Sequence, residues 1–238
     1  MRRLVQSIVS VILLLICLVP AYGQREPDPA KPGRDATPRS ASDFIRTRFV
    51  HGLPYQEARQ IQPNEIPLLL HVLSDRREEA YWTNAVGTLG AIGDVRAVSP
   101  LIGFLEAEDH GILSSEHYRA KASVLIALGY LVHASQDEQA LTYLIDSADM
   151  KVWDTRNLQW ISPFYPTPES RNLQLVKKAI LGLGLTGHPK ALEVLETFRK
   201  KPRSEHDRRL QAQVRSVLNE ALKAHSIVQE VGLMGYYR

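Results

Sequence analysis

The side chains best able to do chemistry are eight histidines, and they stand singly along the chain. They are His51, His71, His110, His117, His133, His188, His206 and His225. A metal-binding helix usually places two ligands one turn apart, as in His-x-x-x-His or Glu-x-x-His. No such spacing recurs on a predicted helix. The sequence therefore predicts no metal site and no cofactor.

One segment does bring acids and histidines together. Asp109 precedes His110 and Glu116 precedes His117, in and just after a predicted loop between two helices. A carboxylate that orients an imidazole is a common source of a general base. A hydrolase or lyase with an unrecognised site near His110 and His117 is therefore an alternative. No nucleophile elbow, phosphate-binding loop or paired catalytic motif accompanies it, and we expect a protein that is not an enzyme.

A second candidate lies at residues 149–170, where aromatic side chains and prolines gather. They are Trp153, Trp160, Phe164 and Tyr165, with Pro163, Pro166 and Pro168. Prolines at this density exclude one continuous helix, so we expect an irregular insert. The four aromatic side chains either pack as a cover over the edge of the fold or form a binding patch for a peptide, a glycan or a protein. The sequence leaves both readings open.

The elements that must position these residues are helices, because apolar residues recur at helical spacing along most of the chain. The predicted helices cover 64–73, 78–92, 96–105, 116–132, 138–148, 172–185, 190–198 and 204–224. Glycine in the left-handed conformation ends a helix, and we assign this role to Gly93 and Gly187. Asp94, either Ser114 or Ser115, and Ser204 can cap the helices that follow them. Shorter helices are expected between residues 43 and 61.

Two of these helix pairs share a pattern of Ala, Leu-Gly, Gly, a polar residue, Ala, an aliphatic residue and Leu. The first copy is Ala85, Leu89, Gly90, Gly93, Asp94, Ala97, Val98 and Leu101. The second copy is Ala179, Leu183, Gly184, Gly187, His188, Ala191, Leu192 and Leu195. A third unit matches in part through Leu128, Gly129, Ala140, Leu141 and Leu144. Repetition of helix pairs at this scale indicates an α-solenoid.

The stretch from Leu89 to Val98 resembles the short bacterial type of HEAT repeat, also known from phycobilisome-lyase subunits. The resemblance implies an all-α fold, an α-α superhelix of about four to five helix pairs over residues 43–231. It also implies a scaffold that binds a protein partner and whose Ala, Leu and Gly positions are structural. Lyase members attach bilins to cysteines of their partners, and nothing in this sequence indicates that chemistry.

The amino terminus has the layout of a secretory signal peptide over residues 1–23. Arg2 and Arg3 precede an apolar run over residues 4–19, and small residues then lead to a cleavage site after Gly23. We expect an exported protein, periplasmic or extracellular. The alternative is a membrane anchor formed by residues 4–19, if the segment stays uncleaved.

The remaining segments have few residues to bury. Residues 24–42 are rich in proline and charge, which predicts a disordered linker, and residues 232–238 are expected to form a C-terminal tail. The whole chain has a formal net charge of +3. Removal of Arg2 and Arg3 would leave 27 basic and 26 acidic residues, a net charge of +1. A nearly neutral chain gives no reason to expect a nucleic-acid partner.

Overall fold

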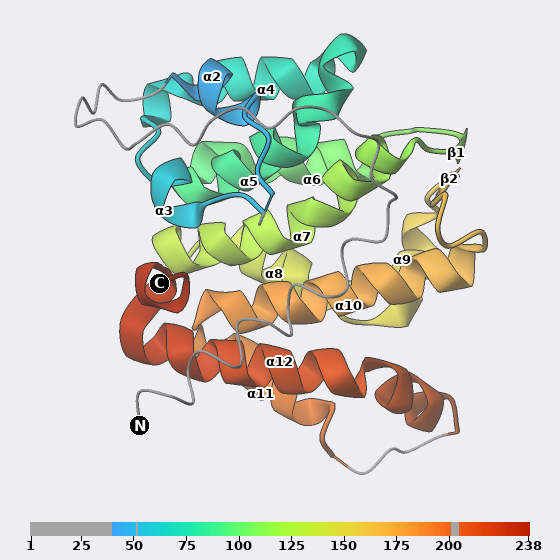
Figure 1. Ribbon diagram of the computed structural model, residues 1–238. Helices are drawn as coiled ribbons and strands as arrows, with labels where there is room; N and C mark the ends of the chain where they lie inside the picture. The colour runs from blue at the N-terminus through green and yellow to red at the C-terminus, as the bar shows by residue number, and fades with distance from the viewer. Residues whose placement is uncertain (1–39, 51, 201–204) are drawn as a thin grey trace.

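The computed structural model describes residues 40–50, 52–200 and 205–238, and this part of the chain is a stack of α-helices (Figure 1). The helices are α2 (Ala41–Ile45), α3 (Tyr55–Ala58), α4 (Ile66–Ser74), α5 (Trp82–Ile92), α6 (Val98–Glu106), α7 (Ser115–Ser135), α8 (Glu138–Ser147), α9 (Met150–Arg156), α10 (Pro168–Thr186), α11 (Pro189–Thr197) and α12 (Glu205–Tyr236). Two short strands, β1 (Gly111–Ile112) and β2 (Trp160–Ile161), pair in parallel. The predicted all-α fold is confirmed.

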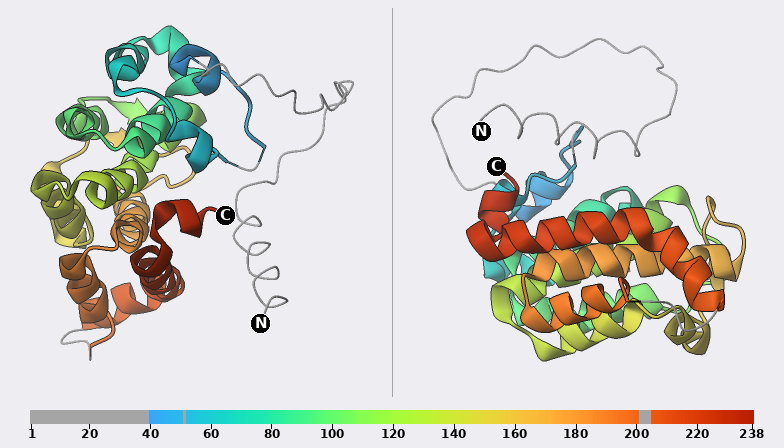
Figure 2. Two further views of the ribbon diagram at one scale, coloured as in Figure 1. Left: turned by 90° about the vertical axis from the view of Figure 1, so that its left-hand side faces the viewer. Right: turned by 90° about the horizontal axis from the view of Figure 1, so that it is seen from below.

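The helices form two layers, which Figure 2 shows from the side. One layer, called here the close-packed layer, contains α5, α7, α10 and α12, each in extensive contact with the next. The other, called here the open layer, contains α4, α6, α8 and α11, which pack mainly on the close-packed layer. Three helices of the close-packed layer are each followed by one of the open layer, in the pairs α5/α6, α7/α8 and α10/α11 between α4 and α12, and the arrangement is an α-solenoid.

The glycines of the repeat explain why the helices of the close-packed layer lie so near to one another. A Cβ atom added at Gly90 would lie 2.6 Å from the Ala127 Cα, and one at Gly184 would lie 2.5 Å from the Ala221 carbonyl oxygen. Gly129 lies in the same way against the backbone of Gly182. Helix backbones can approach this closely only where a side chain is missing. The Leu-Gly pairs of the sequence are thus the contact points between successive helices.

The predicted hinges are confirmed. Gly93 has φ 77° and ends α5, and the Asp94 carboxylate accepts a hydrogen bond from the Arg96 backbone N–H. Gly187 has φ 62° and ends α10, and His188 Nδ1 accepts a hydrogen bond from the Lys190 backbone N–H. Since both hinges satisfy free backbone groups of the next helix, these residues have structural roles.

The amino-terminal predictions fall largely outside the described residues. The predicted signal segment and most of the predicted linker lie there, as does the proposed cap Ser204. The linker was expected to reach residue 42, and this boundary is wrong, because Ala41 and Ser42 lie in α2 and Ala41 is fully buried. Among the described helices, none is both long and apolar enough to span a bilayer.

The expected irregular insert is also more ordered than predicted. Residues 150–156 form α9, because Asp149 accepts a hydrogen bond from the Lys151 backbone N–H and starts a helix there. Trp160 and Ile161 then pair with β1. Pro168 occupies the first turn of α10, where its missing N–H is harmless, and Thr167 caps that helix. Of the three prolines, only Pro163 and Pro166 lie in irregular chain.

The C-terminal tail prediction is wrong. α12 continues beyond residue 224 and changes direction at Gly232, where φ is 67° and ψ is 175°. The residues after this break, 233–238, are called here the C-terminal turn. Leu233 in this turn is buried, and the Tyr237 ring stacks on Tyr55 of α3 with centroids 5.2 Å apart. The end of the chain is therefore part of the core.

Candidate binding groove

The four aromatic residues that the sequence singles out differ in their burial. Trp153 and Trp160 are fully buried, and Trp153 Nε1 donates a hydrogen bond of 2.8 Å to the Ser147 carbonyl oxygen. Their assignment to a partner-binding patch is wrong, since a buried indole cannot contact a partner in this fold. Phe164 is 49% exposed and Tyr165 partly buried, and both rings lie 6.0 Å from the Tyr118 ring. A partner could reach Phe164 and part of Tyr165.

Of the acids and histidines near residue 110, Asp109 and His117 belong to a largely buried ionic cluster. Asp109 Oδ2 lies 2.8 Å from Lys121 Nζ and 3.3 Å from His117 Nε2, and its Oδ1 lies 2.5 Å from Arg76. His117 and Lys121 are buried, whereas His110 and Glu116 are exposed. The cluster thus joins only two of the four residues considered for a catalytic site.

The protonation of this cluster follows from burial and charge. Burial of Asp109 acts to raise its pKa, but the hydrogen bond and positive charge of Lys121 outweigh it and lower the pKa overall. Burial lowers the pKa of His117 despite the nearby Asp109 carboxylate. Lys121 Nζ also donates to the carbonyl oxygens of Phe104 and Leu105, at 2.8 and 3.1 Å. Lys121 therefore satisfies the carboxyl end of α6, which is a structural role.

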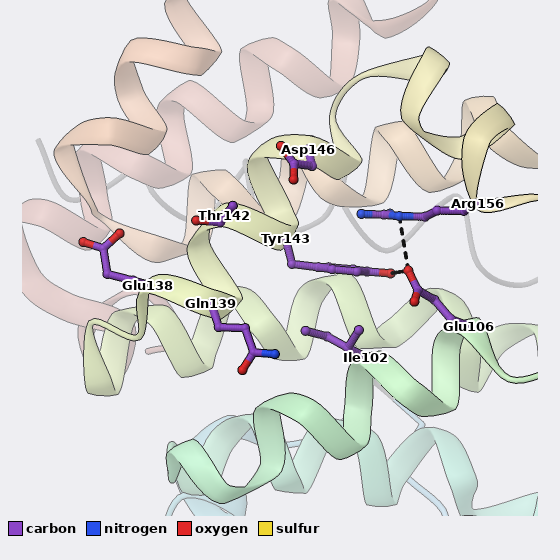
Figure 3. A pocket seen from close by; sticks show the side chains of 8 residues that line it. All are labelled: Ile102, Glu106, Glu138, Gln139, Thr142, Tyr143, Asp146 and Arg156. Atoms are coloured by element: carbon purple, nitrogen blue, oxygen red, sulfur yellow. Dashed lines mark hydrogen bonds and ion pairs between the residues drawn. The ribbon is translucent and has the colours of Figure 1, made fainter.

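A groove lies between α6 and α8 on the open layer (Figure 3). Its volume is about 610 Å³. The lining side chains come from α6, α8 and α9, and are Ile102, Glu106, Glu138, Gln139, Thr142, Tyr143, Asp146 and Arg156. The groove exists because the open layer lacks the glycine contacts that bring the other layer together.

Arg156 closes one end of the groove. Its guanidinium carbon lies 4.0 Å from the centre of the Tyr143 ring and 4.4 Å from that of Trp153. Glu106 Oε1 accepts a hydrogen bond of 2.9 Å from the Tyr143 hydroxyl and lies 3.2 Å from Arg156 Nε. Arg156 also donates to Ser147 Oγ at 2.8 Å. Burial raises the pKa of Tyr143 well above its ordinary value, although the Arg156 charge opposes this.

The groove is acidic overall. Its lining contains three carboxylates, Glu106, Glu138 and Asp146, and one guanidinium. Glu138 makes an ion pair of 3.1 Å with Lys190, and both partners are more than half exposed. Within the described residues, Asp146 makes no ion pair. A cationic side chain from outside could therefore enter the groove and meet a carboxylate and an aromatic ring.

Sequence reasoning did not find this groove. Glu106, Tyr143 and Arg156 belong to three helices, and no local motif connects them. One signal was present, since Trp153 and Arg156 are three residues apart and share a helix face once α9 is recognised. Residues able to hold a metal ion, in groups of three or more His, Cys, Asp or Glu, do not occur together in the part of the chain described.

The fold and its glycine contacts define an α-solenoid built from helix pairs. Residues 83–107, which cover α5 and α6, match the family model of the PBS lyase HEAT-like repeat. The chain thus contains a HEAT-like repeat at α5 and α6, within an all-α solenoid. Comparisons with curated proteins and with solved structures found no significant match.

Proposed function

We propose that this protein is an exported scaffold without enzymatic activity that holds a protein partner in the α6–α8 groove. The observation that carries the proposal is the groove itself, an accessible surface whose lining holds three carboxylates and an aromatic ring. HEAT-like repeats support a scaffold role, because stacked helix pairs provide extended surfaces for binding.

The chemistry of the groove favours a basic segment of the partner. A lysine or arginine of the partner would lie close to Asp146 and beside Tyr143, a second cation would reach Glu138, and Ile102 would take a neighbouring apolar side chain. Exposed ion pairs of this kind contribute less than about 1 kcal/mol each and weaken with salt. We therefore expect moderate, salt-dependent binding.

The test compares two triple variants with the same change in net charge. The groove variant is Glu106→Gln, Glu138→Gln and Asp146→Asn. The control is Glu116→Gln, Glu193→Gln and Glu230→Gln, since these three residues are exposed and lie outside the groove. Binding is measured by fluorescence anisotropy with a labelled peptide of alternating arginine and leucine, and with a peptide in which glutamate replaces arginine.

The proposal expects the wild type and the control to bind the arginine peptide and the groove variant to lose that binding. The glutamate peptide should bind to none of them. Equal binding of the arginine peptide by the groove variant and the control would contradict the proposal. Export is tested separately, by cell fractionation and amino-terminal sequencing, and should give a chain that begins at Gln24.

A further inference from the structure

A second cavity lies where α9, the segment that follows it and the start of α10 meet, away from the groove. Its volume is about 370 Å³, near the lower end of the roughly 300–1,000 Å³ found for small-molecule sites. The side chains that matter for the argument are Trp153, Asp154, Asn157, Leu158, Arg171 and Asn172. The size suits one small ligand and excludes a folded partner.

The polar part of the cavity is held in place from within the core. Arg171 and Asn172 are 2% and 1% exposed. Arg171 donates to the Asn172 side-chain oxygen at 2.8 and 3.0 Å and to the carbonyl oxygens of Leu158 and Trp160. Asn172 Nδ2 in turn donates to Asp154 Oδ1 at 3.0 Å. These bonds fix Asp154 relative to the buried side of the cavity.

Several groups around the cavity keep unused hydrogen-bonding capacity. In residues 40–50, 52–200 and 205–238, no hydrogen bond engages Asp154 Oδ2, the side-chain amide of Asn157 or the second N–H of Asn172 Nδ2. The carboxylate oxygen is an acceptor, and an asparagine amide offers both a donor and an acceptor. Asp154 and Asn157 are also exposed at the rim. The cavity can thus both donate hydrogen bonds to a ligand and accept hydrogen bonds from it.

The charges at the cavity indicate an uncharged ligand. The Arg171 guanidinium and the Asp154 carboxylate carry opposite charges, and Asn172 bridges them. The remaining lining consists of Gln159 and the apolar side chains of Leu158, Ile161 and Pro168, with the fully buried Trp153 behind them. An anion would meet Asp154 and a cation would meet Arg171. A molecule with hydroxyl groups on one side and C–H groups on the other matches both parts of the lining.

We propose that this cavity binds one unit of a saccharide. The sugar hydroxyls hydrogen-bond to Asp154, Asn157 and Asn172, and the C–H face lies against the apolar side chains. This site goes beyond the proposed function, because it uses other residues and another class of ligand. The segment 149–170 then supplies this second binding site as well as Arg156 of the groove.

The test is a titration of the ¹⁵N-labelled chain with glucose, galactose, mannose and N-acetylglucosamine, followed by NMR. We expect at least one sugar to shift the backbone amides of residues 154–159 and the indole of Trp153, with a Kd of about 1 mM. Asp154→Asn keeps the bond to Asn172 and removes the charge. Asn157→Gly removes the side chain and tolerates the backbone, because Asn157 has φ 49°.

Each variant should weaken sugar binding at least about 10-fold, a loss of roughly 1.4 kcal/mol. Lys151→Ala, an exposed change in the same helix, should bind as the wild type does. Unchanged spectra with all four sugars would overturn the proposal. Tighter binding of phosphate or gluconate than of the sugars would overturn it too, since the site would then select an anion. The groove variant should leave sugar binding unaffected, so the two proposals fail independently.

Discussion

The Arg156 guanidinium lies between two aromatic rings, with its central carbon 4.0 Å from the centre of the Tyr143 ring. Trp153 forms the other side of this arrangement at 4.4 Å and is fully buried. The insert that interrupts the repeat is therefore joined to α8 by a cation–π contact and by the hydrogen bond to Ser147. This contact sets the shape of the groove end.

Arg156→Ala should lower the free energy of unfolding by about 1–2 kcal/mol, because a cation–π contact and a partly buried hydrogen bond are lost together. Arg156→Lys should lower it by less, since a cation remains but the planar fork does not. Denaturation by urea measures the free energy of unfolding of both variants. Lys151→Ala in the same helix serves as the control, and an Arg156→Ala chain as stable as this control would refute the structural role.

The glycine contacts of the close-packed layer give a second prediction. Gly129→Ala should destabilise the fold by about 1–3 kcal/mol, because the new methyl group meets the backbone of Gly182 and the two helices must separate. Gly103→Ala in α6 should instead stabilise it by up to about 1 kcal/mol, since nothing lies within 4 Å of a Cβ atom there. Thermal unfolding of both variants distinguishes the two effects. A change in stability of the same sign in both variants would contradict the explanation.

Lys121 permits a test of the buried ionic cluster. Lys121→Met should cost about 3–5 kcal/mol, because it removes the buried cation beside Asp109, leaves the exposed Arg76 as the remaining ion-pair cation, and leaves the last carbonyl groups of α6 without a donor. Adding Asp109→Asn should recover part of this loss, since the second change removes the charge of Asp109. Urea denaturation of the single and double variants gives the coupling free energy between Lys121 and Asp109. Additive losses would show that the two residues do not interact.

Buried tyrosines predict a loss of stability in alkali. Burial raises the pKa of Tyr118 to about 12, and it raises those of Tyr130 and Tyr237 as well. In the unfolded chain these hydroxyls ionise near pH 10. Above that pH the folded chain binds more protons than the unfolded chain, so the free energy of unfolding should fall as pH rises. A spectrophotometric titration should show these tyrosines ionising late, and ionisation of all nine near pH 10 in the folded chain would contradict the assignment.

The repeat could be predicted from sequence because its signals are local. Gly93, Asp94 and Gly187 act within a few residues of their positions, and the sequence assigns them correctly. The prediction of an irregular insert was wrong in part for the opposite reason. The density of prolines indicated irregular chain, and this outweighed the signal from Asp149, which caps a helix. The burial of Trp153 and Trp160 depends on how α7, α8 and α10 pack around them, and no local pattern specifies this packing.

The groove and the C-terminal turn depend on contacts between distant parts of the chain. Tyr143 and Glu106 meet only after α6 and α8 have packed on α7. Gly232 indicates the end of a helix, but it cannot indicate that the residues after it return to α3. Sequence periodicity predicts which elements form, and the sites arise where those elements meet.

The C-terminal turn has a mechanical consequence for the whole molecule. In an open solenoid each repeat contacts only its neighbours, so the array can stretch and its ends can fray independently. Here the Tyr237 hydroxyl lies 2.6 Å from the Tyr130 hydroxyl, and its ring stacks on Tyr55 near the start of the described chain. This bridge ties the first helices to the last. The stack should therefore resist extension as a closed loop does, and its two ends should unfold in one cooperative step.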